Sequence, residues 1–478
     1  MSRAILQAEA DRLLQKSAVY GPDIRWQQTE FSEILPFPTP LSLSVLRALA
    51  GHEGATGMVC REFGIPYNHD VPIDDYLETI FGRTFVNSAA EQLLTKGTTP
   101  PSFWRNLVAA TRMQQEKRSY YLKFNHIIDR LDTFYQEHRA IDLAAIPDPA
   151  LPGRIEFLLS HLNDQYRSVV KAGLLAKHAL DELASGCAPE QLTSLLTVDY
   201  RSLRSKPEAL PIFAFREQSL DRFAGYGAEI DYELSCPRFL ERQQIIAPVV
   251  RPVKMESPAS VPIKRKTENL LLTFKIYESL KIIFKTMLLR ELYLLRLMLL
   301  EYERRNCRPG EVFYLTLTEL LSDRGEMFSA RIAERQATEA AFKPLDIPGT
   351  VALADLAELG RRKRIKAAPR PLSGISVHGR PFAGQALICT DGTNYADVDP
   401  TRILVVRQAR PDLVVMFGKA RGIVAETGGM LSHLAIVARE RGFPLVIQVT
   451  GATAHIKDGD RIEVDKSGNI TINNRVPT

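Results

Sequence analysis

The chain has 478 residues, which is enough for two to four domains with well-buried cores. Its formal net charge is only +5, and no stretch interleaves basic and aromatic residues, so the composition argues against a nucleic-acid-binding protein. The five cysteines are scattered without CxxC pairs, which argues against a zinc site and for reduced thiols in a cytoplasmic protein.

The larger, N-terminal part of the sequence has the pattern of a helical domain. It begins with a charged amphipathic segment that lacks the apolar core of a signal peptide. Apolar residues then recur at helical spacing between about residues 40 and 345, in the segments Leu41–Leu49, Tyr76–Phe81, Phe103–Leu131, Ile155–Leu183 and Leu270–Arg304. The most apolar stretch, Leu280–Leu300, contains five charged residues, each costly inside a bilayer, so it predicts a buried helix of a soluble protein.

A change of composition marks the end of the helical part. Residues 366–374 are rich in proline and basic residues and predict an extended linker. Beyond it, short apolar runs between turn residues predict strands at Gln385–Cys389, Arg402–Val406, Gly422–Ala425, Leu445–Gln448, Arg461–Val464 and Ile470–Ile472. The expected fold is therefore multidomain, with a large, mainly α-helical domain over residues 1–365, a linker over 366–378 and a compact α/β domain over 379–478.

A single histidine near the C-terminus carries the strongest chemical signal. His433 follows the pair Gly428-Gly429 and precedes an apolar-periodic segment, so it should stand at the start of a short helix. Neutral imidazole is nucleophilic near pH 7, and its phosphoramidate can pass a phosphoryl group on. Backbone N–H groups at the glycines, the helix dipole and the hydroxyls of Thr427 and Ser432 would favour the phosphoryl oxygens. By position alone, however, a histidine after two glycines is more often an ordinary turn residue, and Ser432 could simply cap the helix.

The sequence around this histidine resembles a known signature. The run TGGMLSHLAIVARERGFPLVI, from Thr427 to Ile447, is similar to the phosphohistidine motif of phosphoenolpyruvate synthases, pyruvate phosphate dikinases and rifampin phosphotransferases. The resemblance implies a swivelling domain whose histidine takes a phosphoryl group at one site and delivers it at another. It implies catalytic roles for His433, Thr427 and Arg439, and phosphoryl-binding roles for Gly428, Gly429 and Ser432.

Other segments extend the resemblance over most of the chain. Phe31–Ser42, which reads FSEILPFPTPLS, and Phe81–Asn87 are similar to the opening of the acceptor-binding helical domain of rifampin phosphotransferases. Arg308–Leu320 is similar to the segment that closes that domain.

The resemblance also implies where the phosphoryl group comes from. The family's ATP-grasp domain normally precedes the PFPTPLS-like segment, where this sequence has about thirty residues and no GxxxxGKS/T loop. We therefore expect this chain to bind no cofactor and no metal, and MgATP to bind a separate ATP-grasp protein. In the resembling enzymes ATP yields AMP and inorganic phosphate, and the β-phosphoryl group passes to histidine.

Basic residues within the most apolar helix form a second, weaker candidate site. Lys281, Lys285 and Arg296 fall near one helical face, with Arg290 close by. The resemblance implies that basic residues of the helical domain meet the phosphoryl group, so these four are predicted phosphoryl contacts. The alternative, a solvated basic stripe, stays open.

The hypothesis that we favour from the sequence is the transfer component of a split, dikinase-type phosphotransferase. His433 would carry the phosphoryl group from the ATP-grasp partner to a small-molecule acceptor, with no nucleic acid or membrane involved. One alternative is a non-catalytic binding or regulatory protein that retains the fold. Another is an activating synthase, which would use the phosphorylated acceptor as an intermediate for ligation or condensation.

Overall fold

The computed structural model describes most of the chain. The described residues are 2–96, 103–186, 232–238, 241, 264–322, 328–343, 345, 347, 350–359, 372–377, 379–389, 398–409, 413, 416–417, 419–427, 433–440, 442–449 and 451–473. The chain divides into two compact units, one made of residues 1–175, 215–239 and 277–366, the other of residues 176–214, 240–276 and 367–478. Within the described ranges, none of the helices combines the length and apolar character that a membrane crossing requires.

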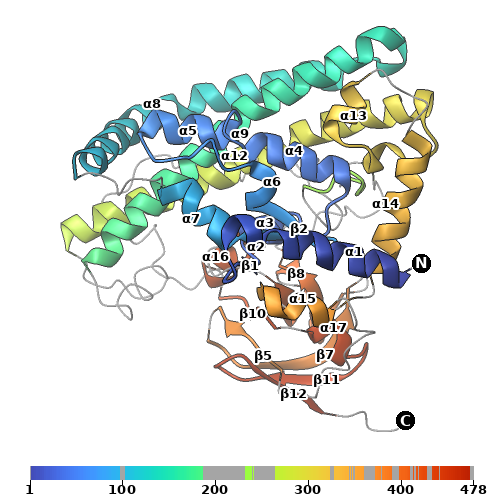
Figure 1. Ribbon diagram of the computed structural model, residues 1–478. Coiled ribbons are helices and arrows are strands. Elements are labelled where there is room, and N and C mark those ends of the chain that lie inside the picture. Colours follow the sequence, from blue (N-terminus) through green and yellow to red (C-terminus); the bar gives the residue numbers. More distant parts are fainter. Residues whose placement is uncertain are drawn as a thin grey trace. The chain divides into compact units, whose positions relative to one another are not determined.

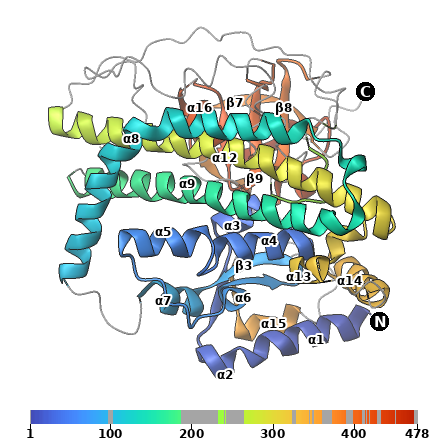
Figure 2. The same ribbon diagram turned by 90° about the horizontal axis from the view of Figure 1, so that it is seen from above.

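Three long helices contribute most of their length to the first unit, while residues 176–185 and 265–276 belong to the second. Helices α8 (Phe103–Arg139), α9 (Leu151–Ser185) and α12 (Arg265–Asn306) run side by side, as Figure 2 shows. Their facing side chains include aromatic and polar pairs: Phe134 of α8 stacks on His161 of α9, with ring centroids 3.5 Å apart. The helices predicted at Phe103–Leu131, Ile155–Leu183 and Leu270–Arg304 are thereby confirmed.

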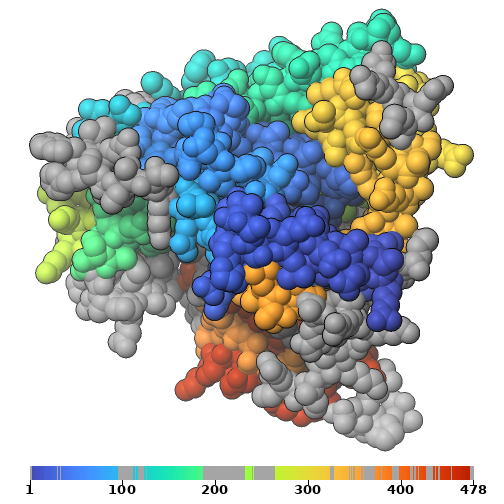
Figure 3. All heavy atoms as spheres, viewed as in Figure 1, coloured from blue at the N-terminus to red at the C-terminus, as the bar shows by residue number. Residues whose placement is uncertain are grey.

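Shorter helices complete this unit. They are α1 (Ser2–Gln15), α2 (Ser17–Tyr20), α3 (Glu30–Ile34), α4 (Pro40–Ala50), α5 (Ala55–Phe63), α6 (Ile73–Tyr76), α7 (Ser88–Lys96), α13 (Leu317–Leu321), α14 (Phe328–Phe342) and α15 (Leu353–Leu359). Helices α1 and α15 contact one another and lie together on the face drawn in Figure 3. They bury Leu13 and Leu356 in one cluster with Trp26 and Phe81, so the two ends of this unit share a core.

A four-stranded sheet that the sequence did not predict lies under these helices. Its strands are β1 (Arg25–Gln27), β2 (Leu77–Ile80), β3 (Arg83–Asn87) and β4 (Thr350–Ala352), in the order β2-β3-β1-β4. The prediction of a helical segment at Tyr76–Phe81 is therefore wrong. Leu77, Ile80 and Phe81 have helical spacing, but Phe81 and Gly82 both adopt positive φ (44° and 75°) and form a tight hairpin turn.

The second unit is built on an eight-stranded sheet. Its strands are β5 (Leu372–Ser373), β6 (Ile375–Ser376), β7 (Phe382–Ile388), β8 (Arg402–Gln408), β9 (Gly422–Thr427), β10 (Leu445–Ile447), β11 (Arg461–Val464) and β12 (Asn469–Asn473), in the order β5-β12-β11-β7-β8-β9-β10-β6 (Figure 1). Strands β7 to β10 run parallel, and the outer strands pair antiparallel. All six predicted strands and the mainly helical, then α/β, fold class are confirmed.

Side chains alternate strictly between the two faces of this sheet. Leu404, Ile423 and Leu445 point into a core shared with helix α16 (His433–Glu440). Their neighbours in the strands, such as Val405 and Val424, point into a second core shared with helix α17 (Ala452–His455). The alternation follows from the twofold repeat of a strand, and it places one helix on each face.

The predicted linker is partly sheet. Residues 372–376, inside the predicted linker 366–378, form β5 and β6, which pair with β12 and β10. Gly374 between them fits closely, because a Cβ atom there would lie 2.4 Å from the carbonyl oxygen of Ile447. Residues 366–371 lie outside the described part of the chain, so the boundary between the predicted domains stays a prediction.

Candidate functional site

The candidate site stands at the carboxyl end of strand β9. In the parallel pairing, Thr427 at the end of β9 lies opposite Gln408 of β8. Helix α16 then begins at His433, so the histidine occupies the first helical position. Residues 428–432, which include Gly428, Gly429 and Ser432, lie outside the described residues, as do the side chains of Thr427 and His433. Their predicted roles stay predictions.

Helix α16 is fixed by its apolar face. Leu434, Ala435 and Ala438 are fully buried against the sheet. The helix ends where Gly442 adopts a left-handed conformation (φ 61°) and the N–H of Phe443 donates to the carbonyl of Ala438 at 2.8 Å. At the amino end of the helix, N–H groups without helical partners and the positive end of the helix dipole favour an anion.

Arg439 comes from the last turn of the same helix. Its side chain is half-buried. It lies six residues after His433, about 1.7 helical turns on, so the two predicted catalytic residues belong to one helix.

A carboxylate that the sequence did not single out lies beside this edge. Glu426 precedes Thr427, and its Oε1 accepts hydrogen bonds from the backbone N–H and the hydroxyl of Thr453, at 2.7 and 2.6 Å. Thr453 is in the first turn of α17 and lies 27 residues later in the chain. In the sequence, the only sign of a role for Glu426 was its position next to Thr427. Its partner Thr453 could be identified only from the fold.

The predicted phosphoryl contacts Lys281 and Lys285 lie half-exposed on α12. Lys281 Nζ lies 3.8 Å from Glu278 Oε1, one turn earlier on the same helix. Lys285 Nζ lies over the ring of Tyr232, 5.7 Å from its centroid. Both ammonium groups thus have acidic or aromatic neighbours within the first unit.

Arg290 and Arg296 are buried and point to different neighbours. Arg290 donates to Asp132 Oδ1 at 2.8 Å and stacks on Tyr135, with its guanidinium carbon 3.9 Å from the ring centroid. Arg296 donates to the backbone carbonyl of Leu234. Among the described residues, these contacts join the four predicted basic residues to different neighbours, and their role in phosphoryl binding stays a prediction.

The PFPTPLS segment has an identifiable structural role. Thr39 caps helix α4, with Pro40 at the first helical position. The buried carboxylate of Glu233 accepts hydrogen bonds from the backbone N–H and the hydroxyl of Thr39 at 2.8 Å each, and from Ser42 Oγ at 2.9 Å. A further bond comes from the N–H of Ser235 at 2.9 Å, so this segment is tied to a part of the chain about two hundred residues away.

A histidine of the bundle has a buried carboxylate partner. His161 Nδ1 lies 3.0 Å from Glu291 Oε2, and burial raises the pKa of the Glu291 carboxyl above its usual range. Among the described residues, no group of three or more histidine, cysteine, aspartate or glutamate side chains is arranged to hold a metal ion. The expectation that the chain binds no metal and no cofactor stays a prediction.

A family model matches the part of the chain that contains the candidate site. Residues 398–468 match the model described as PEP-utilising enzyme, mobile domain. The match includes β8, β9, α16, β10, α17 and β11, and it contains all the residues predicted at the phosphohistidine site. This region of the chain is therefore related to the domains that the sequence motif resembled.

Longer proteins share further parts of the sequence. An uncharacterised protein of Mycobacterium tuberculosis is 27% identical over 253 residues, which are 50% of this chain and 29% of that protein. The uncharacterised phosphotransferase YvkC of Bacillus subtilis is 38% identical over 103 residues, 21% of this chain and 12% of that protein. Rifampicin phosphotransferase of Streptomyces sviceus is 31% identical over 156 residues, 32% of this chain and 18% of that protein. The chain thus spans less than a third of each relative, and the names support phosphotransfer at the level of the family.

Proposed function

We propose that the chain is the transfer component of an ATP-dependent phosphotransferase, and that His433 carries the phosphoryl group. One observation carries this proposal: helix α16 begins at His433, six residues after the last residue of β9, inside the region that matches the mobile-domain family. That position combines a nucleophilic imidazole with a helix terminus suited to an anion.

Transfer proceeds in two balanced steps. In the first, an imidazole nitrogen of His433 attacks the β-phosphorus of ATP, the P–O bond to AMP breaks, and the ring loses a proton; water then attacks the γ-phosphorus, and the P–O bond between the β- and γ-groups breaks to release inorganic phosphate. In the second, the acceptor oxygen or nitrogen forms a bond to phosphorus, the P–N bond breaks, and the ring regains the proton that the acceptor loses. The protein's contribution is to hold the donors and the phosphoryl group in line.

The donor and acceptor belong to the proposal as well. A separate ATP-grasp protein supplies the β-phosphoryl group of MgATP, and the helical unit holds a small molecule with a hydroxyl, amide or carboxyl group. Because one relative is named rifampicin phosphotransferase, rifampicin is the first acceptor to assay.

The experiment uses MgATP labelled separately at its β- and γ-phosphorus atoms. With the ATP-grasp partner present, the β label should appear on His433 and the γ label as inorganic phosphate. His433→Asn should stay unlabelled in the same mixture. Label on another residue of the wild-type chain, or micromolar ATP binding to this chain alone in calorimetry, contradicts the proposal.

A further inference from the structure

The clamp between Glu426 and Thr453 joins the candidate site to the opposite face of the sheet. Both hydrogen bonds from Thr453, one from the backbone N–H and one from the hydroxyl, fall on a single oxygen, Oε1 of Glu426. Their lengths of 2.7 and 2.6 Å are those expected of charge-assisted hydrogen bonds. Both bonds are half-buried. They tie the end of β9 to the first turn of α17, which packs against β8 and β9.

The backbone beside the clamp is held in an unusual conformation. Gln448 has a positive φ of 61°, which a residue with a side chain adopts at a cost of about 1 kcal/mol or more. Directly after it, the N–H of Val449 donates to the carbonyl of Ala425 at 3.0 Å. Gly451, with φ 75°, then turns the chain into α17. Val449 and Thr453 therefore attach this part of the chain to β9 at two successive residues, Ala425 and Glu426.

We propose that Glu426 is a positioning residue for the phosphohistidine segment. Residues 428–432 connect two fixed points: the end of β9, held by the clamp, and helix α16, held by the buried Leu434 and Ala435. Donors that bind a phosphoryl group must be held to within about half an ångström, so the anchoring of both ends sets the rate of transfer. The inference rests on the proposed function of His433. It adds which contact anchors the chain at the start of the segment that leads to His433.

The arrangement of the bonds distinguishes positioning from a charge effect. Because both bonds end on one oxygen, the amide oxygen of a glutamine can replace Glu426 Oε1 and accept both. A positioning role therefore predicts that Glu426→Gln retains function and that Glu426→Ala loses it. A role for the negative charge predicts that the two variants lose function together.

The test uses the full chain and potassium phosphoramidate, a small phosphoryl donor that needs no nucleotide site. In this reaction the P–N bond of the donor breaks, a P–N bond to the His433 ring forms, and ammonia leaves with the ring proton. Phosphorylation of His433 is followed by mass spectrometry at a temperature where thermal melting shows every variant to be folded. Glu426→Ala should react about tenfold or more slowly than wild type, and Glu426→Gln within about threefold.

A matched control and a second measurement complete the test. Glu463 accepts a hydrogen bond from Asn473 at 2.9 Å in the β11–β12 hairpin, so Glu463→Ala removes a similar carboxylate without touching the clamp. That variant should react at the wild-type rate. Amide hydrogen exchange of residues 427–433 should become faster in Glu426→Ala and stay unchanged in Glu426→Gln and Glu463→Ala.

The outcomes separate this inference from the proposed function. If wild type is phosphorylated at His433 and Glu426→Ala reacts equally fast, the positioning role is wrong while the carrier role stands. If neither wild type nor any variant is phosphorylated, the carrier role fails. The hydrogen-exchange measurement then still tests the positioning role of Glu426, because unchanged exchange in Glu426→Ala overturns it. Equal slowing in Glu426→Gln and Glu426→Ala also overturns the positioning role and assigns the effect to charge.

Discussion

The eight-stranded sheet and the helical unit bury different kinds of side chains. Among the described residues of 372–473, every buried side chain is apolar. The helical unit instead buries charged side chains, each at most 5% exposed; these include Glu78, Glu233, Arg238, Arg290, Glu291 and Arg296. The sheet is thus held by packing that any shape-matched apolar set can supply, whereas the helical unit depends on particular long-range polar partners.

The largest loss of stability is expected when one buried carboxylate of the helical unit is removed. Glu233→Ala leaves Thr39, Ser42 and the N–H of Ser235 without their acceptor, and it should destabilise the helical unit by about 3 to 5 kcal/mol. Chemical denaturation with hydrogen exchange of α4 amides measures the change. Glu53→Gln, at an 85% exposed side chain, is the control and should change stability by less than about 0.5 kcal/mol. A loss from Glu233→Ala as small as that of the control would show that the buried polar partners do not hold this unit.

The same comparison predicts a smaller effect of pure packing in the sheet. Leu434→Ala removes a fully buried side chain from the core between α16 and the sheet, and it should cost about 3 kcal/mol. Leu434→Met keeps most of the volume and should cost less than about 1.5 kcal/mol. Hydrogen exchange of β8 and β9 amides reports both losses within this unit. Equal costs for the two variants would contradict a packing origin.

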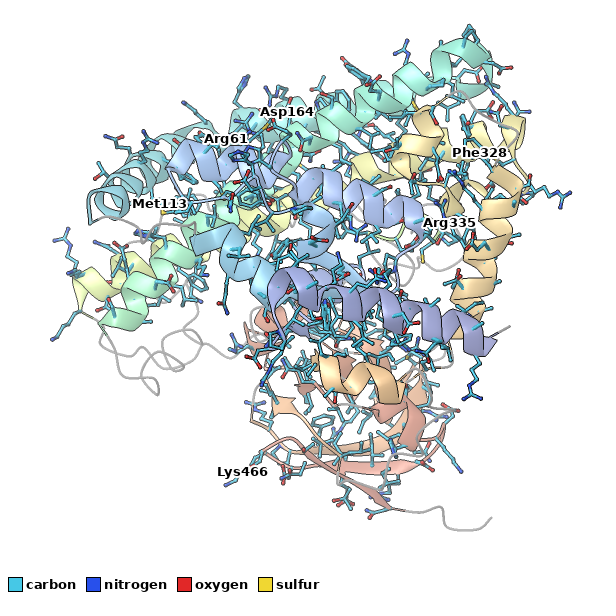
Figure 4. The ribbon with its side chains drawn as sticks, in the orientation of Figure 1. Arg61, Met113, Asp164, Phe328, Arg335 and Lys466 are labelled. Atoms are coloured by element: carbon cyan, nitrogen blue, oxygen red, sulfur yellow. The ribbon has the colours of Figure 1, made fainter. Side chains whose placement is uncertain are left out.

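The smallest predicted effect concerns a half-exposed network in the helical unit. Burial by itself would raise the pKa of Glu319, but hydrogen bonds from Arg335 at 2.7 Å, from the Thr316 backbone and from Arg331 outweigh it and lower the pKa to about 2 (Arg335 on α14 is labelled in Figure 4). Since the folded pKa lies below the unfolded value, the stabilisation is present above about pH 4.5 and is lost as pH falls towards 2.

The corresponding measurement compares stability against pH for wild type and Glu319→Gln. The difference should be about 1 kcal/mol at neutral pH, because the pairs are partly screened by solvent, and it should close between about pH 4.5 and 2. Glu334→Gln, at an exposed position of α14, is the control and should change stability at neutral pH by less than about 0.5 kcal/mol. A gap between wild type and Glu319→Gln that stays constant down to pH 2 would contradict the ion-pair network.

The contrast between the units also explains what the sequence could predict of the fold. In the sheet, the apolar run Ile403, Leu404 and Val405 is visible locally, so the strands were found from such runs and the turn residues between them. Strand β2 was missed because Leu77 and Ile80 have helical spacing, and because Glu78 looks like a surface residue. Its burial depends on Arg12 and Trp26, 66 and 52 positions away, which no local pattern contains.

The same limit applies to the candidate site. The start of a helix at His433 and its end before Gly442 follow from a contiguous motif, and the structure has both. The clamp on Glu426 requires Thr453 from another helix, and the neighbours of Arg290 and Arg296 come from α8 and from residues 232–238. Contacts between residues that are far apart in the sequence could not be predicted from the local spacing of residues.

Direct mapping of the phosphorylated residue tests the central claim, that His433 carries the phosphoryl group. The full chain is treated with phosphoramidate, digested at alkaline pH and analysed by mass spectrometry, with His433→Asn and His455→Asn treated in parallel. We predict one rapidly formed, acid-labile and base-stable phosphate on His433, absent from His433→Asn and present at the wild-type level in His455→Asn. Rapid phosphorylation of His433→Asn at another residue, or a wild-type chain whose His433 stays unmodified while other histidines react, would contradict the account.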